Sequence, residues 1–467
     1  MVQVGSIPVE LWDQVLVSLP KVTQRECAFV CRSWRRVCRR ALFTVVRLST
    51  GNGTEADEMD LEAFVEAAKA WEILDCMGND PTFAPVVKTI IVLKWRFGAS
   101  VFETRSLQKA LRAVPHLQSF QWLAWAGMPQ EVLQTLHDDI PNLPELRLAD
   151  PEALQSCELG QLRSIGCLVP QDFFDTEDLE VAQCSTIGLI TANVDTLREL
   201  ALDAMLSLPW NLPVRTFENL NHLTLVGLKD LRGLELVLRH SPNLENFIIE
   251  YKIDDELFSI LAQNPSSAPL LSSFKVISGA VHDESHYAAL GTFLQGHPRL
   301  RRLDIQMWAP IESAFIILPT VKALKDLTAF GLSVSCRPSP VDGIDYSCLP
   351  LFLSDDMEAV RFEVNLEEAV LDRGPLLPLM VRLAELPSLR YLSLQHHGDG
   401  ELWPLAAEVG SQLKHLDCLS LDTSLWFIER ASPPEMLASA WLPNKHILRL
   451  REDFAYQDAE WLARFVV

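Results

Sequence analysis

Residues 241–249 read Ser-Pro-Asn-Leu-Glu-Asn-Phe-Ile-Ile, and this short phrase is the unit from which most of the chain is built. Pro242 cannot continue a helix, so a helix that precedes it has to end there. Leu244 then turns the chain into a strand, in which the alternating apolar residues Phe247 and Ile249 point to one side. The phrase therefore predicts the end of a helix, a turn and a short strand with one buried face.

The same pattern, Leu-x-x-apolar-x-apolar, returns along the chain at intervals of about 25 residues. It occurs at residues 117–122, 143–148, 197–202, 220–225, 271–276, 300–305, 327–332, 389–394 and 416–421. Amphipathic segments such as 231–239, 256–263, 287–295 and 376–386 lie between the phrases and fit helices. These units resemble leucine-rich repeats, which implies an α/β solenoid with a curved parallel sheet and outer helices. The alternative is a plain α/β domain with leucine-rich strands.

Before the repeats, residues 1–43 predict three short helices. Ser6 is a good N-cap, Pro8 pre-sets the first turn, and apolar residues recur at helical spacing until Pro20. A second helix fits residues 23–30, with Thr23 and Glu26 as a capping box, and a third fits residues 33–42, with an arginine-rich face opposite an apolar stripe. So small a core is unstable alone, so we expect these helices to bury an apolar face on another protein.

The order of motifs in this region is specific. Residues 7–11 read Ile-Pro-Val-Glu-Leu, a Leu-Pro break follows at 19–20, and residues 30–34 read Val-Cys-Arg-Ser-Trp. Over residues 6–43 the chain closely resembles the F-box family. The resemblance implies docking on the Skp adaptor of cullin–RING ubiquitin ligases through Ile7, Pro8, Leu11, Val15, Leu19, Val30, Cys31, Trp34 and Val37. The alternative is an ordinary three-helix cap on the domain that follows.

The resemblance also guides the division of the chain. Residues 9–12, 28–34 and 42–43 are similar to the expanded F-box families of mushroom-forming fungi, and the absence of an asparagine ladder favours the irregular, F-box-associated type of repeat. We predict an F-box at 1–43, a connecting strand and helix at 44–85, the solenoid at 86–452 and a capping helix at 453–467. Opening strands are expected at 42–48 and 86–93, a helix within 54–77, a weak phrase around Leu179 and an inserted loop at 336–347.

Composition limits the partners. The chain has 467 residues and a formal net charge of -22, which opposes binding to a phosphate backbone. Its 10 cysteines lack a paired spacing, and no leader-like segment opens the sequence. No stretch reaches the roughly 18 apolar residues that cross a membrane. We therefore expect reduced thiols, a cytoplasmic and/or nuclear location, and neither a nucleic acid nor a membrane as partner.

Candidate catalytic groups are weak. His282 and His286 have the i, i+4 spacing of a metal site on a helix, but no third ligand is evident and both fit an ordinary helix start. His396 and His397 follow a predicted strand without a nucleophile or base at a recognisable spacing. No phosphate-binding loop, hydrolase elbow or kinase motif is present. We predict no metal, no cofactor and no enzymatic activity.

A docking module followed by a long scaffold predicts the substrate-recognition subunit of an SCF-type ubiquitin ligase, with a protein substrate held on the repeats. Residues between the apolar strand positions should face the substrate. In the range 220–425 we expect Lys275, Arg302, Asp304, Tyr391 and Gln395 to contact it. A phosphate reader would need converging cations, which only the first two of these approach. The alternative function is a leucine-rich-repeat binding module with an F-box-like cap and no ligase role.

Overall fold

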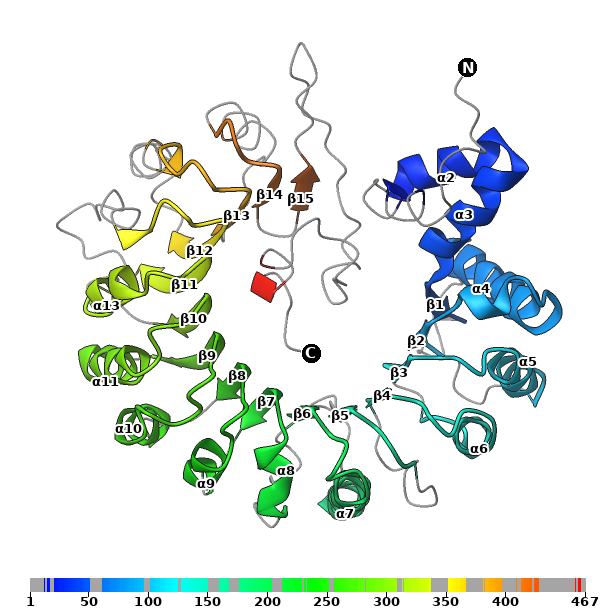
Figure 1. Ribbon diagram of the computed structural model, residues 1–467, viewed down its shortest axis with the longest axis horizontal. Coiled ribbons are helices and arrows are strands. Elements are labelled where there is room, and N and C mark those ends of the chain that lie inside the picture. The colour runs from blue at the N-terminus through cyan, green and yellow to red at the C-terminus, as the bar shows by residue number, and fades with distance from the viewer. Residues whose placement is uncertain are drawn as a thin grey trace. The chain divides into compact units, whose positions relative to one another are not determined.

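The computed structural model describes residues 12, 15–16, 21–50, 61–95, 101–124, 127–149, 159–167, 176–203, 212–228, 231, 233–251, 256–281, 283–308, 313, 315–336, 352–366, 381, 383–396, 409, 413–421, 424–427, 458 and 461–462. The chain divides into two compact units, unit 1 (Met1–Asn219) and unit 2 (Leu220–Val467). In each unit the strands form a parallel sheet, and the helices lie along one face of it (Figure 1). The predicted α/β class, with a parallel sheet and outer helices, is confirmed.

Unit 1 begins with the helices predicted to form the docking module. Trp12, Val15 and Leu16 have helical backbone, and they are followed by α2 (Lys21–Val30) and α3 (Arg32–Phe43). Helix α2 starts two residues earlier than predicted, so Thr23 lies inside it and cannot be its N-cap. Helix α3 starts one residue early because Cys31 caps it: its Sγ accepts a hydrogen bond from the backbone N–H of Trp34 at 3.5 Å.

The rest of unit 1 alternates strands and helices, with sheet order β1 to β6. The elements are β1 (Val45–Ser49), α4 (Leu61–Asn79), the 3-10 helix η2 (Ala84–Val86), β2 (Thr89–Lys94), α5 (Val101–Arg112), β3 (Ser119–Trp122), α6 (Gln130–Asp139), β4 (Glu145–Leu148), β5 (Ser164–Cys167), α7 (Thr176–Ala192), β6 (Glu199–Asp203) and α8 (Val214–Glu218). The first predicted strand starts three residues late, because α3 continues to Phe43.

Unit 2 continues the same alternation in the order β7 to β15. Its elements are β7 (His222–Leu228), α9 (Leu234–Arg239), β8 (Asn246–Tyr251), α10 (Glu256–Gln263), β9 (Ser273–Val281), α11 (Glu284–Gln295), β10 (Arg302–Trp308), α13 (Leu318–Ala323), β11 (Ala329–Cys336), β12 (Ala359–Leu366), β13 (Tyr391–His396), β14 (Cys418–Leu421) and β15 (Ser424–Phe427). Only β15 among these described strands runs antiparallel to its neighbour, β14.

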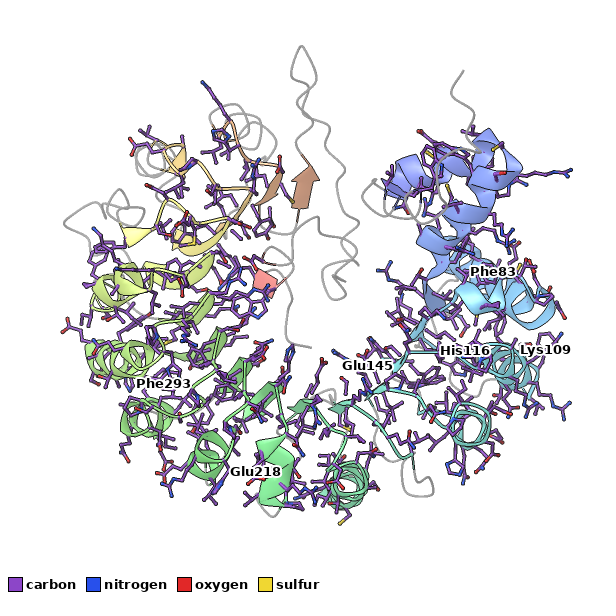
Figure 2. The ribbon with its side chains drawn as sticks, viewed as in Figure 1. Phe83, Lys109, His116, Glu145, Glu218 and Phe293 are labelled. Atoms are coloured by element: carbon purple, nitrogen blue, oxygen red, sulfur yellow. The ribbon has the colours of Figure 1, made fainter. Side chains whose placement is uncertain are left out.

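The repeat phrase forms the predicted turn and strand. Leu244, Phe247 and Ile249 are fully buried. The backbone N–H groups of the two residues after Leu244 both donate to the carbonyl oxygen of Asn221, at 2.8 and 3.0 Å, and the next phrase repeats this contact one strand further on. Each turn is therefore hydrogen-bonded to the previous one before its strand begins. The alternating side chains fill the space between sheet and helices, where Figure 2 shows Phe293 of α11.

Two strand predictions need correction. The weak phrase around Leu179 lies inside the helix α7 and not in a strand. Conversely, residues 357–362 lead into β12, which begins at Ala359; the leucine pattern missed this repeat strand because Met357 replaces the first Leu. Met357 is as buried as the leucines at that position. A long unbranched apolar side chain fills the same place.

Several predicted features fall outside the described residues. These include most of the first docking helix, the inserted loop beyond Cys336 and most of the segment 376–386. The capping helix predicted at 453–467 is described only at Asp458, Trp461 and Leu462. These three residues contact β8, β9 and β10, in the interior of the repeat series.

Candidate functional site

The first candidate surface is the outer side of α2. Phe29 and Val30 at the end of this helix are 81% and 68% exposed, and Val15 before it is 48% exposed. Large apolar side chains in such positions cost free energy unless a partner covers them. Val15, Val30 and the exposed Cys31 belong to the predicted docking set, whereas the sequence analysis did not select Phe29. Its place beside Val30 was the signal available for it.

Other predicted docking residues support this surface from beneath. Trp34 and Val37 are half-buried, and the ring of Trp34 lies 4.9 Å from that of Trp12, centroid to centroid. The buried Gln24 amide donates to the carbonyl oxygen of Leu16 at 2.7 Å, which ties the first helical segment to α2. Ile7, Pro8, Leu11 and Leu19 lie outside the described residues. Trp34 therefore packs α3 against the first helical segment through Trp12.

The docking helices are anchored on the first repeat through Arg39 of α3. Its Nη2 lies 2.8 Å from Asp80 Oδ2, and its guanidinium lies over the ring of Phe83 at 5.1 Å. Asp80 also accepts from the backbone N–H and the hydroxyl of Thr82, and hydrogen bonds from Arg39 and Thr82 hold the pKa of Asp80 well below its usual range. Phe43 meets Phe83 edge-on at 5.1 Å. These contacts hold α3 against the segment between α4 and β2.

The second candidate surface is the helix-free side of the sheet in unit 2, which we call the inner face. Strand register defines two rows of residues on it. The first row is His222, Asn246, Ser273, Arg302, Ala329, Ala359 and Tyr391, and the second is Thr224, Ile248, Lys275, Asp304, Gly331, Arg361 and Ser393. Because side chains alternate along a strand, both rows point away from the apolar core.

The second row holds a buried ionic cluster centred on Asp304. Lys275 Nζ lies 2.9 Å from Asp304 Oδ2, and Arg361 Nη2 lies 2.6 Å from Asp304 Oδ1. The three side chains are only 1%, 7% and 0% exposed for Lys275, Arg361 and Asp304. Gln306 donates to Asp304, and Arg361 also pairs with Glu363. Burial acts to raise the pKa of Asp304, but Arg361 and Lys275 together hold it below its ordinary value.

The cluster crosses a strand because that strand carries a glycine. Gly331 of β11 lies in register between Asp304 of β10 and Arg361 of β12. A Cβ at Gly331 would lie 2.1 Å from Asp304 Oδ1 and 3.2 Å from Arg361 Nε. Any side chain there would push the ion pair apart. Here glycine is required for close approach of neighbouring side chains.

The chain's own C-terminal segment lies on this inner face (Figure 1, red). Arg302 Nε lies 2.7 Å from Asp458 Oδ1, and the hydroxyl of Thr328 donates to Asp458 Oδ2 at 2.6 Å. Lys275 Nζ lies 5.7 Å from the ring centroid of Trp461 and 3.5 Å from the carbonyl oxygen of Leu462. Trp461 Nε1 donates to Asn246 Oδ1 at 3.4 Å. All three C-terminal residues are buried. We call Asp458, Trp461 and Leu462 the C-terminal segment.

The structure changes what the predicted substrate residues can do. Lys275 and Asp304 form an ion pair with each other, and Arg302 forms one with Asp458. Tyr391 is fully buried. The side chain of Gln395 lies outside the described residues. Each of the two cations that suggested phosphate reading faces a carboxylate of the chain itself. Sequence reasoning missed Arg361 because its strand was not recognised, and it missed the C-terminal segment because no pattern links it to residues so distant in sequence.

Among the histidine candidates, His286 has a structural role. His286 Nδ1 accepts from the backbone N–H of Asp283 at 3.1 Å, completing a capping box at the start of α11. In the described part of the chain, no group of three His, Cys, Asp or Glu side chains is arranged to hold a metal ion. Nor does this part include a helix of the length and apolarity that a bilayer requires. His282 and His397 lie outside the described residues.

Comparison with known proteins identifies the N-terminal module. Residues 5–45 match the F-box domain family, so the chain carries an F-box domain where the sequence motifs place it. No curated protein sequence matches the chain. Among solved structures, the chain is similar to one in the crystal structure of the Rad7 and Elc1 complex in yeast, at 11% sequence identity and a TM-score of 0.36, over 75% of this chain and 82% of that chain.

Proposed function

We propose that this chain is the substrate-recognition subunit of an SCF-type cullin–RING ubiquitin ligase. The F-box domain would dock on a Skp-type adaptor, and the repeats would hold a protein substrate. The contribution to catalysis would be proximity: a substrate lysine held near a ubiquitin-loaded enzyme reacts at a high effective concentration, without a reactive group from this chain. The match of residues 5–45 to the F-box domain supports the adaptor role.

The observation that carries the proposal is the exposed apolar surface at the end of α2. Phe29 and Val30 lie within the matched domain and are the most exposed of the large apolar side chains in the described region, apart from Phe102. An ordinary cap on the repeats would cover its apolar residues against the repeats. Here α3 makes that contact, through Arg39 and Phe43, and leaves the end of α2 to a partner.

The test is co-purification of the full chain with a Skp-type adaptor. We expect wild type to bind, and Phe29→Glu with Val30→Glu to lose binding by more than tenfold, because a buried charge replaces an apolar contact. Leu236→Glu is the matched control, since Leu236 is an exposed apolar residue of α9 in unit 2. Failure of wild type to bind would contradict the proposal; equal binding by all variants would move the docking surface elsewhere. Adding the cullin distinguishes a ligase subunit from a binding module without a ligase role.

For the substrate we propose the inner face of unit 2, with Arg302 as its charged anchor. Among the predicted contact residues whose side chains are described, Arg302 combines partial exposure with a carboxylate partner from outside the sheet. Lys275, Asp304 and Tyr391 lie on the same face and are buried, so they would shape the surface around Arg302. The predicted contribution of Gln395 stays a proposal.

A further inference from the structure

We propose that the inner face of unit 2 is a binding site for short helical peptides. Such a peptide has a carboxylate at one position, a tryptophan three residues later and an apolar residue directly after the tryptophan. The C-terminal segment of the chain has this pattern and occupies the site in cis. The inference rests on the proposed function and names the class of substrate segment that the site would take. It also makes the C-terminal segment a built-in competitor of that substrate.

The carboxylate end of the site is formed by two donors from adjacent repeats. Arg302 opens β10, and Thr328 immediately precedes β11. Each of them contacts a different oxygen of Asp458, at 2.7 and 2.6 Å. A guanidinium and a hydroxyl that together satisfy both carboxylate oxygens select an acidic side chain, because an amide or an apolar group would leave one donor unpaired.

The aromatic end lies on the neighbouring strands β8 and β9. The ammonium of Lys275 lies over the Trp461 ring and also reaches the carbonyl oxygen of Leu462, while Asn246 accepts from the indole N–H. A cation over the ring face and an acceptor at its nitrogen favour tryptophan over phenylalanine, which has no N–H.

The spacing of the ligand follows from its backbone. Asp458, Trp461 and Leu462 have helical backbone, and residues three and four apart share one face of a helix. The carboxylate and the indole therefore point at the sheet together, across strands about 4.8 Å apart. An extended peptide with the same residues would send these side chains in different directions.

The segment is tethered as a competitor would be. Residues 428–457 separate it from β15, the last described strand of the sheet. Because the segment belongs to the same chain as its site, its binding is an intramolecular event that a separate ligand has to compete with. A substrate segment of the same chemistry would displace it only if it bound more tightly or were itself held nearby, so the arrangement discriminates against weak ligands.

The test uses the full-length chain and a fluorescent peptide with the sequence of residues 453–467. Asp458→Ala with Trp461→Ala in the chain removes the cis contacts while leaving the site itself intact. We expect this variant to bind the peptide at least tenfold more tightly than wild type, measured by fluorescence anisotropy. The same peptide with both residues replaced by Ala should not bind the variant.

A charge exchange tests the carboxylate end. Arg302→Glu, added to the double variant, should abolish binding of the original peptide, and a peptide with Arg in place of Asp458 should restore it. Equal peptide binding by wild type and double variant, or none by the double variant, would overturn the proposal. If the double variant does not fold, Asp458→Asn replaces it, with an expected gain of about threefold; no gain would again overturn it.

Adaptor co-purification is measured on the same preparations. Loss of the peptide effect with adaptor binding intact would overturn only this inference. Loss of adaptor binding by wild type with the peptide effect intact would overturn only the proposed ligase role.

Discussion

The helix-free faces of the two units carry similar residues at the same register but bury them very differently. In unit 1, Arg147 pairs with Glu145 two residues away on β4 at 2.7 Å, and the two side chains stay 27% and 25% exposed. In unit 2 the corresponding row holds the buried cluster of Asp304, Lys275 and Arg361. Figure 2 shows Glu145 on the helix-free side of β4. The same strand position can therefore hold a solvated ion pair or a desolvated one.

Both faces use a glycine to make room. Gly166 of β5 lies beside Arg147 of β4, and a Cβ there would be 2.9 Å from Arg147 Cγ. Gly331 does the same for the cluster in unit 2, with less clearance. In unit 2 the C-terminal segment covers part of the row, through Lys275. The ion pair of unit 1 stays partly exposed, whereas the cluster of unit 2 is buried and one of its members, Lys275, is covered by a segment distant in sequence.

The largest expected effect is that of neutralising the buried carboxylate. Asp304→Asn leaves Lys275 and Arg361 with a poorly matched partner in a buried place, so we expect a loss of about 3 kcal/mol in the free energy of unfolding. Glu145→Gln is the matched change in unit 1, and it should cost no more than about 0.5 kcal/mol. Urea titration measures both, and amide hydrogen exchange assigns the loss to the strands of each unit. Equal losses would remove the distinction between the two faces.

Asp304→Asn should also change how the stability of the protein depends on pH in acid. The folded pKa of Asp304 lies below its ordinary value, so its charge contributes stability that is present above the unfolded pKa near 3.9 and is lost as the pH falls through the folded pKa. Wild type should lose this contribution below about pH 4, and Asp304→Asn should lack that part of the pH dependence.

A methyl group at Gly331 of β11 should have the next largest effect on the free energy of unfolding. Gly331→Ala forces Asp304 and Arg361 apart, and we expect a cost of about 2 kcal/mol in the free energy of unfolding. Gly166→Ala should cost less than about 1 kcal/mol, because the partly exposed Arg147 can adopt another rotamer in solvent. Chemical denaturation with hydrogen exchange again reads both variants. A larger loss at Gly166 than at Gly331 would contradict this account.

Truncating Arg302 in unit 2 and Arg147 in unit 1 should give the smallest difference in the free energy of unfolding between the two faces. Arg302→Ala removes the partner of the buried Asp458 and should destabilise unit 2 by about 1–2 kcal/mol. Arg147→Ala should cost about 0.5 kcal/mol or less. The protection of β10 and β11 amides against hydrogen exchange is the direct measurement. If Arg302→Ala left the exchange rates of the β10 and β11 amides unchanged, the contact with the C-terminal segment would not stabilise this face.

Much of the fold was predictable because it is written in local patterns. The leucine at the head of each phrase and the alternation after it predicted most strands, and α10 was predicted with its observed bounds. The prediction was wrong around Leu179, where an apolar run does not distinguish a buried helix from a strand, and it missed the strand after Met357. The start of α3 was missed because a cysteine is not an expected cap.

The F-box domain was predictable for the same reason, since its motifs are contiguous in sequence. By contrast, the sequence identified Lys275, Arg302 and Asp304 as a set without indicating which oppositely charged group each of them would pair with. Their partners lie far away in the chain: Arg361 is 57 residues from Asp304, and Asp458 is 156 residues from Arg302. Nothing in local spacing couples residues at such separations.

The repeating strand and helix unit, the helical N-terminal module and the side of each strand that faces the core follow from contiguous stretches of sequence, because each depends on residues close together in the chain. Which inner-face charges are buried, which glycine lets them meet and which segment covers them follow from the tertiary structure. Desolvation and ion pairing depend on what lies across the sheet. That is set when the strands take their register and the C-terminal segment packs on them.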